Sequence, residues 1–203
     1  MASPGVYAKG VAKREEILRA TLAVFEREGT SRTTMRTVAA AAGLSLAGLM
    51  HYFPSRDLLL TELMADVERD AEAQLGDPDQ QISPGEFLAR AAEARQSEPG
   101  RVWLYVTLLA ATVDPTHPAA AFFQDRFQRI RTRIADYVRD KQAAGEIPSH
   151  IDPRHTAYSL LAAADGIQSQ WLYDRTIDMG QHIRTTWHVL VHQPESVTSD
   201  AAR

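Results

Sequence analysis

The chain has 203 residues, and its 22 Lys and Arg against 26 Asp and Glu give a net charge of −4, which argues against a general nucleic-acid binder. It has no cysteine, which excludes disulfide bonds, a thiolate nucleophile and a cysteine zinc site. No run reaches the roughly 18 continuous apolar residues of a membrane span, and the N-terminus lacks the apolar core of a signal peptide, so we expect a soluble, cytoplasmic protein.

The first predicted helix runs roughly from Lys9 to Arg27, and Gly29 ends it. A second helix is expected to follow Thr33, whose side chain can cap its first turn. It ends at Gly43, because a residue without Cβ can adopt the left-handed conformation that the turn needs. The inward positions of this helix recur at helical spacing and are Met35, Val38, Ala39 and Ala42.

A third short helix is predicted over Leu46–Tyr52, capped by Ser45 and stopped at Pro54. Two short helices joined by a tight turn that contains glycine match the geometry that places a recognition helix in the major groove of DNA. A fourth helix is expected over 55–75, with Ser55 as its cap. Residues 33–60 therefore predict a DNA-binding helix-turn-helix.

The rest of the chain shows no β-branched alternation and predicts five further helices. They are expected over about 83–96, 101–113, 119–144, 152–173 and 178–192, between breaks rich in Pro and Gly. The sequence thus predicts an all-α fold of nine helices. We expect a DNA-binding head over 1–54, a ligand-binding and dimerisation body over 55–192 whose first helix (55–75) connects the two, and a disordered tail over 193–203.

The charge is distributed unevenly between these parts. The first sixty residues hold eight basic and five acidic residues, which leaves 14 basic and 21 acidic residues for the other 143. A basic head on an acidic body would direct one end of the molecule toward a phosphate backbone.

The head also matches a family pattern. The runs T-T-x-x-x-V-A-x-x-A-G-L-S from Thr33 and L-x-H-Y-F-P-S-R-D-x-L-L from Leu49 follow a first helix that carries Ile17, Leu18, Ala20, Phe25 and Gly29. Together they resemble the tetracycline-repressor (TetR) family of bacterial transcription regulators over about the first sixty residues. The resemblance implies a homodimeric, all-helical protein that binds a pseudo-palindromic operator and releases it when a small molecule enters the C-terminal domain.

The recognition helix departs from the common pattern of that family. Many relatives have Lys, Arg or Gln just after the capping Ser and Thr two positions later, where this chain has Leu46 and Gly48. Arg, Asn and Gln, the main readers of guanine and adenine, are absent between Ser45 and Phe53. Base reading is therefore expected to use thymine methyl groups, a few polar groups and DNA shape. The residues expected to reach bases are Arg36, Ser45, Leu46, Ala47 and His51.

Other side chains of the head are expected to contact the DNA backbone. The residues chosen for phosphate contacts are Thr34, Tyr52 and Arg56. Lys13, together with Lys9 and Arg14, is expected to reach the backbone or the minor groove through a flexible arm. Tyr52 can instead be structural, because its ring can pack against the first helix, and Met50 can pack under the fourth helix.

The aromatic residues of the body are candidates for lining an effector cavity. They are Trp103, Tyr105, Phe123, Phe127 and Trp171. Asp165 and Gln168 fall within one turn and are the expected polar anchors, so the set favours an aromatic or lipophilic effector, and a cationic one beside a carboxylate. In the alternative interpretation the aromatics fill a core, and Asp165 pairs with a nearby Arg or caps a kink at Gly166.

The last two helices have apolar faces wider than the core of a monomer needs. We expect them to pack against their symmetry mates as a four-helix bundle, which sets the two heads about 34–36 Å apart on successive major grooves. The residues expected at this interface are Leu161, Ile183, Trp187 and Val191.

The sequence carries no sign of catalysis. It lacks a phosphate-binding glycine loop and a G-x-S-x-G elbow, and no third ligand accompanies the i, i+4 pair His188 and His192, so we expect no enzyme, no cofactor and no metal site. The predicted function is a ligand-responsive repressor. The alternative is a DNA-binding dimer without a regulatory ligand, which a sealed body core would favour and a cavity of several hundred Å³ would disfavour.

Overall fold

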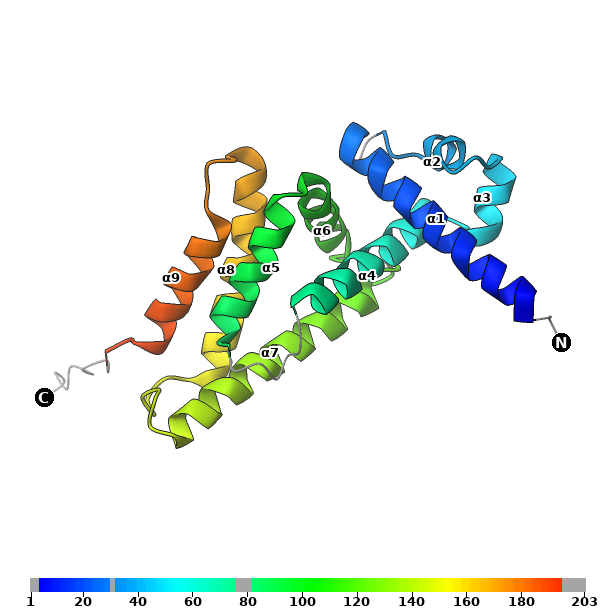
Figure 1. Cartoon of the computed structure of the whole chain (residues 1–203). Coiled ribbons are helices and arrows are strands. Elements are labelled where there is room, and N and C mark those ends of the chain that lie inside the picture. The colour runs from blue at the N-terminus through cyan, green and yellow to red at the C-terminus, as the bar shows by residue number, and fades with distance from the viewer. Residues whose placement is uncertain (1–3, 30–31, 76–81, 195–203) are drawn as a thin grey trace, which may run out of the picture.

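The computed structural model describes residues 4–29, 32–75 and 82–194, and these contain nine α-helices and no strand (Figure 1). The helices are α1 (Pro4–Glu28), α2 (Met35–Ala41), α3 (Leu46–Tyr52), α4 (Arg56–Leu75), α5 (Pro84–Gln96), α6 (Pro99–Ala111), α7 (Ala120–Ala143), α8 (Pro153–Tyr173) and α9 (Met179–Val191). This confirms the predicted all-α fold. Most of the predicted tail (195–203) lies outside the described residues, and none of the described helices is long and apolar enough to cross a membrane.

The caps that the sequence displays fix most helix starts. Ser45 caps α3 as predicted, and Ser83 and Asp152 likewise accept hydrogen bonds from backbone N–H groups in the first turns of α5 and α8. The start of α2 was predicted one residue too early. Thr34, not Thr33, is its N-cap: the Thr34 side chain accepts from the backbone of Thr37, whose hydroxyl accepts from the Thr34 backbone in return.

Two prolines start helices earlier than predicted. Helix α1 begins at Pro4 and α6 begins at Pro99, because proline fits the first turn of a helix, where its missing N–H removes no hydrogen bond. The expected flexible arm is therefore wrong for Lys9, Lys13 and Arg14, which all lie within α1. Gly43, with a φ of 65°, makes the predicted left-handed turn between α2 and α3.

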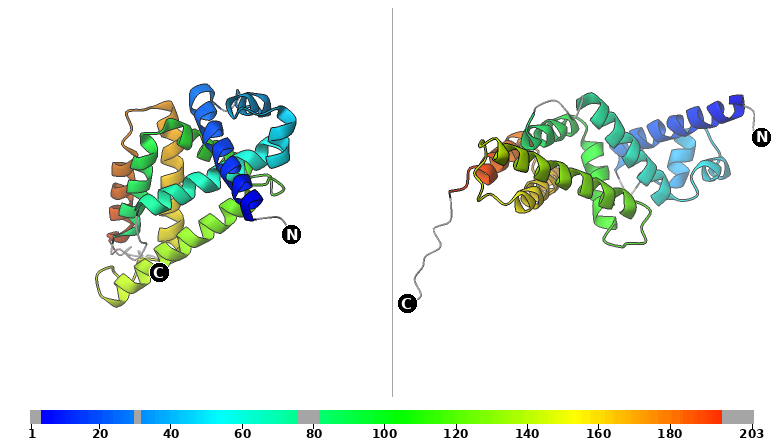
Figure 2. Two further views of the ribbon diagram at one scale, coloured as in Figure 1. Left: turned by 45° about the vertical axis from the view of Figure 1, so that its right-hand side comes forward. Right: turned by 90° about the horizontal axis from the view of Figure 1, so that it is seen from below.

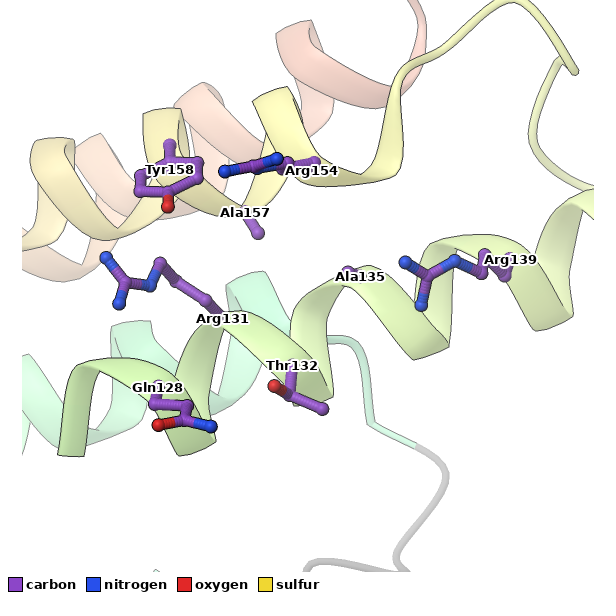
Figure 3. A pocket seen from close by; sticks show the side chains of 8 residues that line it. All are labelled: Gln128, Arg131, Thr132, Ala135, Arg139, Arg154, Ala157 and Tyr158. Carbon is purple, nitrogen blue, oxygen red and sulfur yellow. The ribbon is translucent and has the colours of Figure 1, made fainter. Parts of the chain in front are cut away.

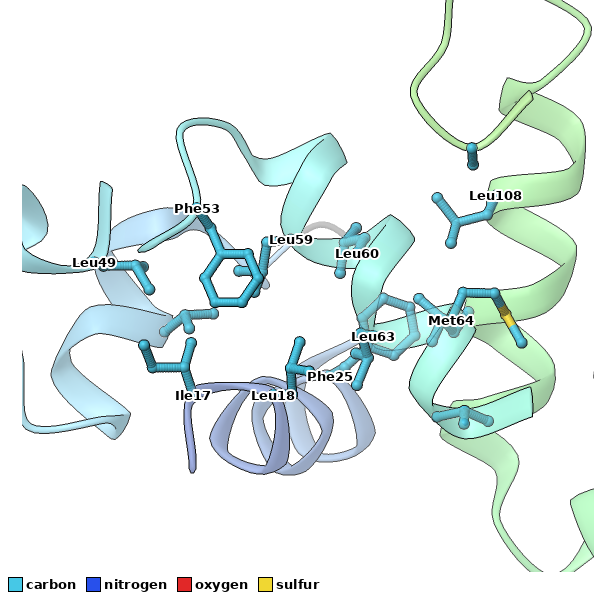
Figure 4. Packing of buried hydrophobic residues seen from close by; sticks show 14 of the residues in the cluster. Ile17, Leu18, Phe25, Leu49, Phe53, Leu59, Leu60, Leu63, Met64 and Leu108 are labelled. Carbon is cyan, nitrogen blue, oxygen red and sulfur yellow. The ribbon is translucent and has the colours of Figure 1, made fainter. Parts of the chain in front are cut away.

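The helices α1–α3 lie at one end of the molecule, and α8 and α9 lie at the other (Figures 1 and 2). A first apolar cluster fills the head and continues into the body. Its residues from α1, α3 and α4 include Ile17, Phe25, Leu49 and Met64, and α6 and α7 add Leu104, Tyr105, Leu108 and Phe123 (Figure 4). Apolar packing thus runs without a break past residue 54, where the head was predicted to end.

A second apolar cluster holds the far end of the body together. Helix α9 packs against α5 and α8, and α8 packs against α7. Ile183 of α9, Trp171 of α8 and Leu88 of α5 all belong to this cluster. Helix α5 and α9 approach so closely that a Cβ on Gly85 would lie 2.3 Å from Cγ of Trp187, so only glycine fits that position without a shift.

Candidate nucleic-acid interface and the buried network behind it

Helix α3 has one face that anchors it and one face that it presents to solvent. Leu49 and Phe53 are fully buried beneath it, and Ser45 caps its start by accepting a 3.0 Å hydrogen bond from Gly48 N. On the other side Ala47, Met50 and His51 are exposed. The helix is therefore fixed by its apolar side, while the opposite side is free to meet a partner.

The side chains predicted to contact DNA lie on or near this exposed surface. Thr34, Arg36, Ser45, Ala47 and His51 are exposed, and Leu46, Tyr52 and Arg56 are half-buried. Their contacts with DNA stay predictions. Met50 corrects one expectation: it is 48% exposed and does not pack under α4, so it adds an apolar group to the presented surface.

Three basic side chains of the head, Lys13, Arg14 and Arg56, act as ties: each links two segments by donating a hydrogen bond to a backbone carbonyl. Arg14 donates a 2.8 Å hydrogen bond to the Tyr52 carbonyl, forms an ion pair with Glu62 of α4, and places its guanidinium 4.4 Å from the centre of the Phe53 ring. Lys13 donates to the carbonyl of Ala42 at 3.2 Å, at the end of α2. Sequence reasoning missed these roles, because the bonds join residues about one helix or more apart.

Arg56 is a tie as well. Its Nε donates a 2.7 Å hydrogen bond to the Thr33 carbonyl, which joins the start of α4 to the segment before α2. Since α4 is the helix that leads from the head into the body, this bond fixes the head on its connection.

In the body, a buried polar network joins five helices. Glu68 of α4 accepts hydrogen bonds of 2.8 Å from Arg95 of α5 and from Nε of Arg126 of α7. Arg126 also donates to the Tyr105 hydroxyl on α6 at 3.0 Å, and that hydroxyl donates to Oδ1 of Asp165 on α8 at 2.6 Å. Glu68, Arg95 and Arg126 are each at most 7% exposed, so the connecting helix is anchored by buried charges.

The two acids of this network are affected in opposite directions. Burial alone would raise the pKa of Glu68, but attraction and hydrogen bonds from Arg95 and Arg126 lower it to about 2. Burial raises the pKa of Asp165, although Tyr105 donates to it and Arg126 lies nearby. At neutral pH an ionised Glu68 therefore supplies one negative charge to the two guanidinium groups.

The residues predicted to line an effector cavity do not form one lining. Tyr105 and Phe123 are packed edge to face in the first apolar cluster, with ring centres 5.4 Å apart, and Phe127 packs against the same cluster. Trp171 lies in the second cluster, and Trp103 is 44% exposed, so its assignment to a cavity is wrong. Asp165, the carboxylate that suggested a cationic effector, accepts from Tyr105 and has two arginines nearby, and the charge of the effector stays a prediction.

Three polar atoms in this part of the body are buried without a hydrogen-bond partner among the described residues. They are Nε of Arg95, Oε1 of Gln168 and Nε1 of Trp171. Gln168, one of the predicted anchors, is 2% exposed and donates from its amide to the Ala164 carbonyl, which leaves its oxygen unused. Buried polar atoms normally have partners, so each of these three atoms can still form a hydrogen bond with water or a ligand.

The residues predicted at the two-fold interface are mostly covered by their own chain. Leu161, Ile183 and Val191 are 5%, 1% and 4% exposed, and Trp187 of α9 packs against Gly85 of α5. The idea that they form a free apolar face is therefore wrong, because α5 and the segment that carries Ile147 and Ile151 bury that face. The large apolar side chains left exposed at this end include Tyr173, at 94%, and Val189, at 55%.

Comparisons with known proteins agree with the geometry of the head. A family model described as bacterial regulatory proteins, tetR family, matches residues 17–63, from the middle of α1 into α4. The HTH-type transcriptional regulator UidR of Escherichia coli (strain K12) is 24% identical over 155 residues, which cover 76% of this chain and 79% of UidR.

Solved structures share the whole fold. A putative TetR-family transcriptional regulator from Rhodococcus sp. matches with a TM-score of 0.72 at 23% identity and covers 89% of this chain and 99% of that protein. A SmeT–triclosan complex matches with a TM-score of 0.59 at 19% identity and covers 88% of this chain and 90% of SmeT. At these identities the likeness shows the arrangement of helices.

Proposed function

Since this chain belongs to the tetR family of bacterial regulatory proteins and is a DNA-binding transcription regulator, not an enzyme, we propose that it is a homodimeric repressor that a small molecule releases from a palindromic operator. The observation that carries this proposal is the continuity from α3 to the body. The exposed face of α3 belongs to the head. The connecting helix α4 leads from the head into the body, where its Glu68 is held by the buried charge network.

Base reading by this head relies on few polar groups. Ser45 and His51 offer hydrogen bonds, and Ala47 and Met50 offer apolar contact with thymine methyl groups. Thr34, Tyr52 and Arg56 hold the phosphate backbone and set the orientation of the head. A site read in this way depends strongly on the shape of the DNA.

A two-fold axis brings two heads to successive major grooves about 34–36 Å apart. The interface uses the exposed outer sides of α8 and α9, including Tyr173 and Val189, in place of the buried residues first expected there. A closed two-fold interface of this kind is the commonest form of homo-oligomer.

The effector acts by changing the position of α4. Glu68 is the residue through which α5 and α7 hold that helix, so a ligand that rearranges Arg95 or Arg126 also changes the direction of the head. The unsatisfied atoms of Arg95, Gln168 and Trp171 support a binding place beside this network. The SmeT–triclosan complex shows a protein of the same fold with a small aromatic ligand.

A DNA-binding dimer without an effector is the second candidate. It is favoured by the tight packing of Tyr105, Phe123 and Trp171 in two separate apolar clusters, since these residues were expected to face a shared cavity. Ligand-dependent release of the operator separates the two functions.

The DNA-binding part is tested with an operator selected from random duplexes and titrated by fluorescence anisotropy. We expect Tyr52→Phe, which keeps the ring that packs on the head, and Arg56→Ala to weaken binding to operator and scrambled duplexes alike, by about 1–3 kcal/mol at most and with a smaller salt dependence. His51→Ala should instead change the preferred sequence. Arg129→Ala, on the exposed side of α7, is the control and should change neither.

A Tyr52→Phe protein that changes its sequence preference but keeps its affinity for scrambled DNA would contradict the assigned roles. Ligand responsiveness is tested with the same operator complex, by screening neutral and anionic aromatic compounds for release. Release that persists unchanged in a Gln168→Leu variant would argue against the binding place beside the network.

A further inference from the structure

A groove outside both the head and the buried network runs between α7 and α8. Its volume is about 290 Å³, and its polar lining consists of Gln128, Arg131, Thr132, Arg139, Arg154 and Tyr158 (Figure 3). None of the residues proposed above to bind DNA or to sense an effector lines it. Its size is at the lower end of the range of small-molecule sites.

The groove exists because the two helices meet there through small side chains. Ala135 of α7 and Ala157 of α8 lie between the arginines and are 7% and 1% exposed. With alanine on both helices, no long apolar side chain fills the groove. The longer polar side chains on either side line it (Figure 3).

Three guanidinium groups from the two helices border this groove, and no carboxylate lines it. Arg139 has an acidic neighbour, Asp136, at 2.5 Å. Arg131 and Arg154 have no ion pair with any described carboxylate and instead lie 4.8 Å and 5.7 Å from the ring centre of Tyr158. Of the other arginines in this part of α7, Arg129 is paired with Asp125 and Arg133 lies 4.6 Å from the ring centre of Phe87.

The local charge is opposite to that of the rest of the body. Residues 61–203 hold 14 basic and 21 acidic residues, so guanidinium groups without an ion pair are not expected from composition. The nearby acid is Asp152, whose pKa is lowered first by a hydrogen bond from the His155 backbone and to a smaller extent by the charge of Arg154. Arg154 and Arg131 also lower the pKa of the Tyr158 hydroxyl, first through a hydrogen bond from Arg154 and then through their charges. The groove therefore combines positive potential with an exposed aromatic ring, 45% accessible, and a hydroxyl.

We propose that this groove binds a small organic anion with at least two negative charges, a phosphate ester or a dicarboxylate. Guanidinium groups bind both kinds of oxyanion through paired hydrogen bonds, and Arg131 and Arg154 face the groove from opposite helices, so one anion can bridge α7 and α8. Tyr158 and Thr132 supply hydroxyl groups to the rest of the ligand.

Binding at this place has a mechanical consequence for the regulator. Helix α7 carries Arg126 and α8 carries Asp165, the two ends of the chain of hydrogen bonds through Tyr105. An anion held between the same two helices fixes their relative position from the outside. The groove is thus a second ligand site, separate from the effector place beside Gln168.

The test uses glycerol 3-phosphate and malate as probes, measured by isothermal titration at constant ionic strength on the full chain. We expect binding with a dissociation constant below 1 mM, and at least tenfold weaker binding in the double variant Arg131→Gln and Arg154→Gln. Arg129→Gln is the matched control, because it removes one exposed charge from the same helix outside the groove, and it should bind like the wild type.

Three titration results would overturn the proposal. They are no binding of either probe at 10 mM, equal affinity in the wild type and the double variant, or an equal loss in Arg129→Gln, which would indicate attraction by net charge alone. Light scattering on the double variant completes the test. A change of oligomeric state would make the groove an interface between copies of this chain, and the anion site would be rejected.

Discussion

In the head, arginines hold backbone carbonyl groups at the ends of short helices, whereas in the body they hold a buried carboxylate. Arg14 and Arg56 bind the carbonyls of Tyr52 and Thr33 at half-buried positions. Arg95 and Arg126 are 6% and 3% exposed and share Glu68. A partly exposed tie contributes little by itself, but removal of one partner from a buried set leaves an uncompensated charge. We therefore expect removal of one partner to reduce the stability of the protein less in the head than in the body.

The largest expected effect comes from Glu68→Gln, which keeps the size of the side chain and removes its charge. Two buried guanidiniums then lose their counter-charge, and we expect the free energy of unfolding to fall by about 3–5 kcal/mol. Glu62→Gln is the matched variant in the head, where the partner Arg14 is partly exposed, and it should cost at most about 1 kcal/mol. Urea unfolding at pH 7 measures both, and similar losses would remove the contrast between head and body.

The same contrast is visible in the pH dependence of stability. The pKa of Glu68 is about 2 in the folded chain against 4.5 in the reference state, so its stabilisation is complete above pH 4.5 and is lost as the pH falls toward 2. Asp165, with a raised pKa, acts in the opposite direction. We expect the wild type to lose roughly 3 kcal/mol of stability over this window, as measured by urea unfolding. A Glu68→Gln protein with an equally steep acid loss would show that other groups cause it.

A smaller effect is expected where head and body touch. A Cβ on Gly100 of α6 would lie 2.3 Å from Cγ of Glu26 and 3.1 Å from its Cα on α1, so Gly100→Ala must move one helix from the other. We expect a loss of about 1–3 kcal/mol together with weaker operator binding.

Gly166→Ala on α8 is the control, because its Cβ would meet nothing within 4 Å, and it should be neutral or stabilise by about 0.5–1 kcal/mol. Thermal unfolding of the two variants side by side measures the difference. If Gly100→Ala is as stable as Gly166→Ala, the contact between α1 and α6 is looser than described.

The smallest effect is expected at the cap of α2. Thr34→Ala removes the oxygen that accepts the Thr37 N–H, and we expect a loss of about 1 kcal/mol. Thr34→Ser retains that oxygen and should restore most of the stability. Chemical denaturation of both proteins tests the assignment, and an equal loss in Thr34→Ser would point to the methyl group and away from the cap.

A feature of this fold can be predicted from the sequence when the residues that determine it lie close together along the chain. The bounds of α3, α5 and α8 could be predicted because Ser45, Ser83 and Asp152 act within their own first turn. The family pattern of the head is local in the same sense. The sequence alone does not separate Thr33 from Thr34 as the cap of α2, because only the reciprocal bond with Thr37 distinguishes them.

The body could not be predicted in the same way. Glu68 contacts Arg95 and Arg126, which lie 27 and 58 residues away in the sequence, and hydrophobic periodicity does not predict contacts of this kind. Asp165 is a candidate anchor in the sequence because its neighbours are apolar, and pairing with an Arg is the alternative. Nothing in the sequence indicates Tyr105 as its partner. Helical spacing shows that Tyr105 and Phe123 point inward, yet it does not distinguish a filled core from a cavity wall. Ile183 and Val191 were placed at an interface because the covering helix α5 lies far away in sequence.

Because Leu104, Tyr105 and Leu108 of α6 share one apolar cluster with Ile17 and Leu49 of the head, the two parts are not independent folding units. The amide protons of α6 and of the buried turns of α1 and α3 should exchange with solvent through the same global unfolding. Calorimetry should record a single transition. A substitution that loosens the recognition helix would then shorten the lifetime of the entire chain, so variants selected for altered DNA preference would also differ in abundance.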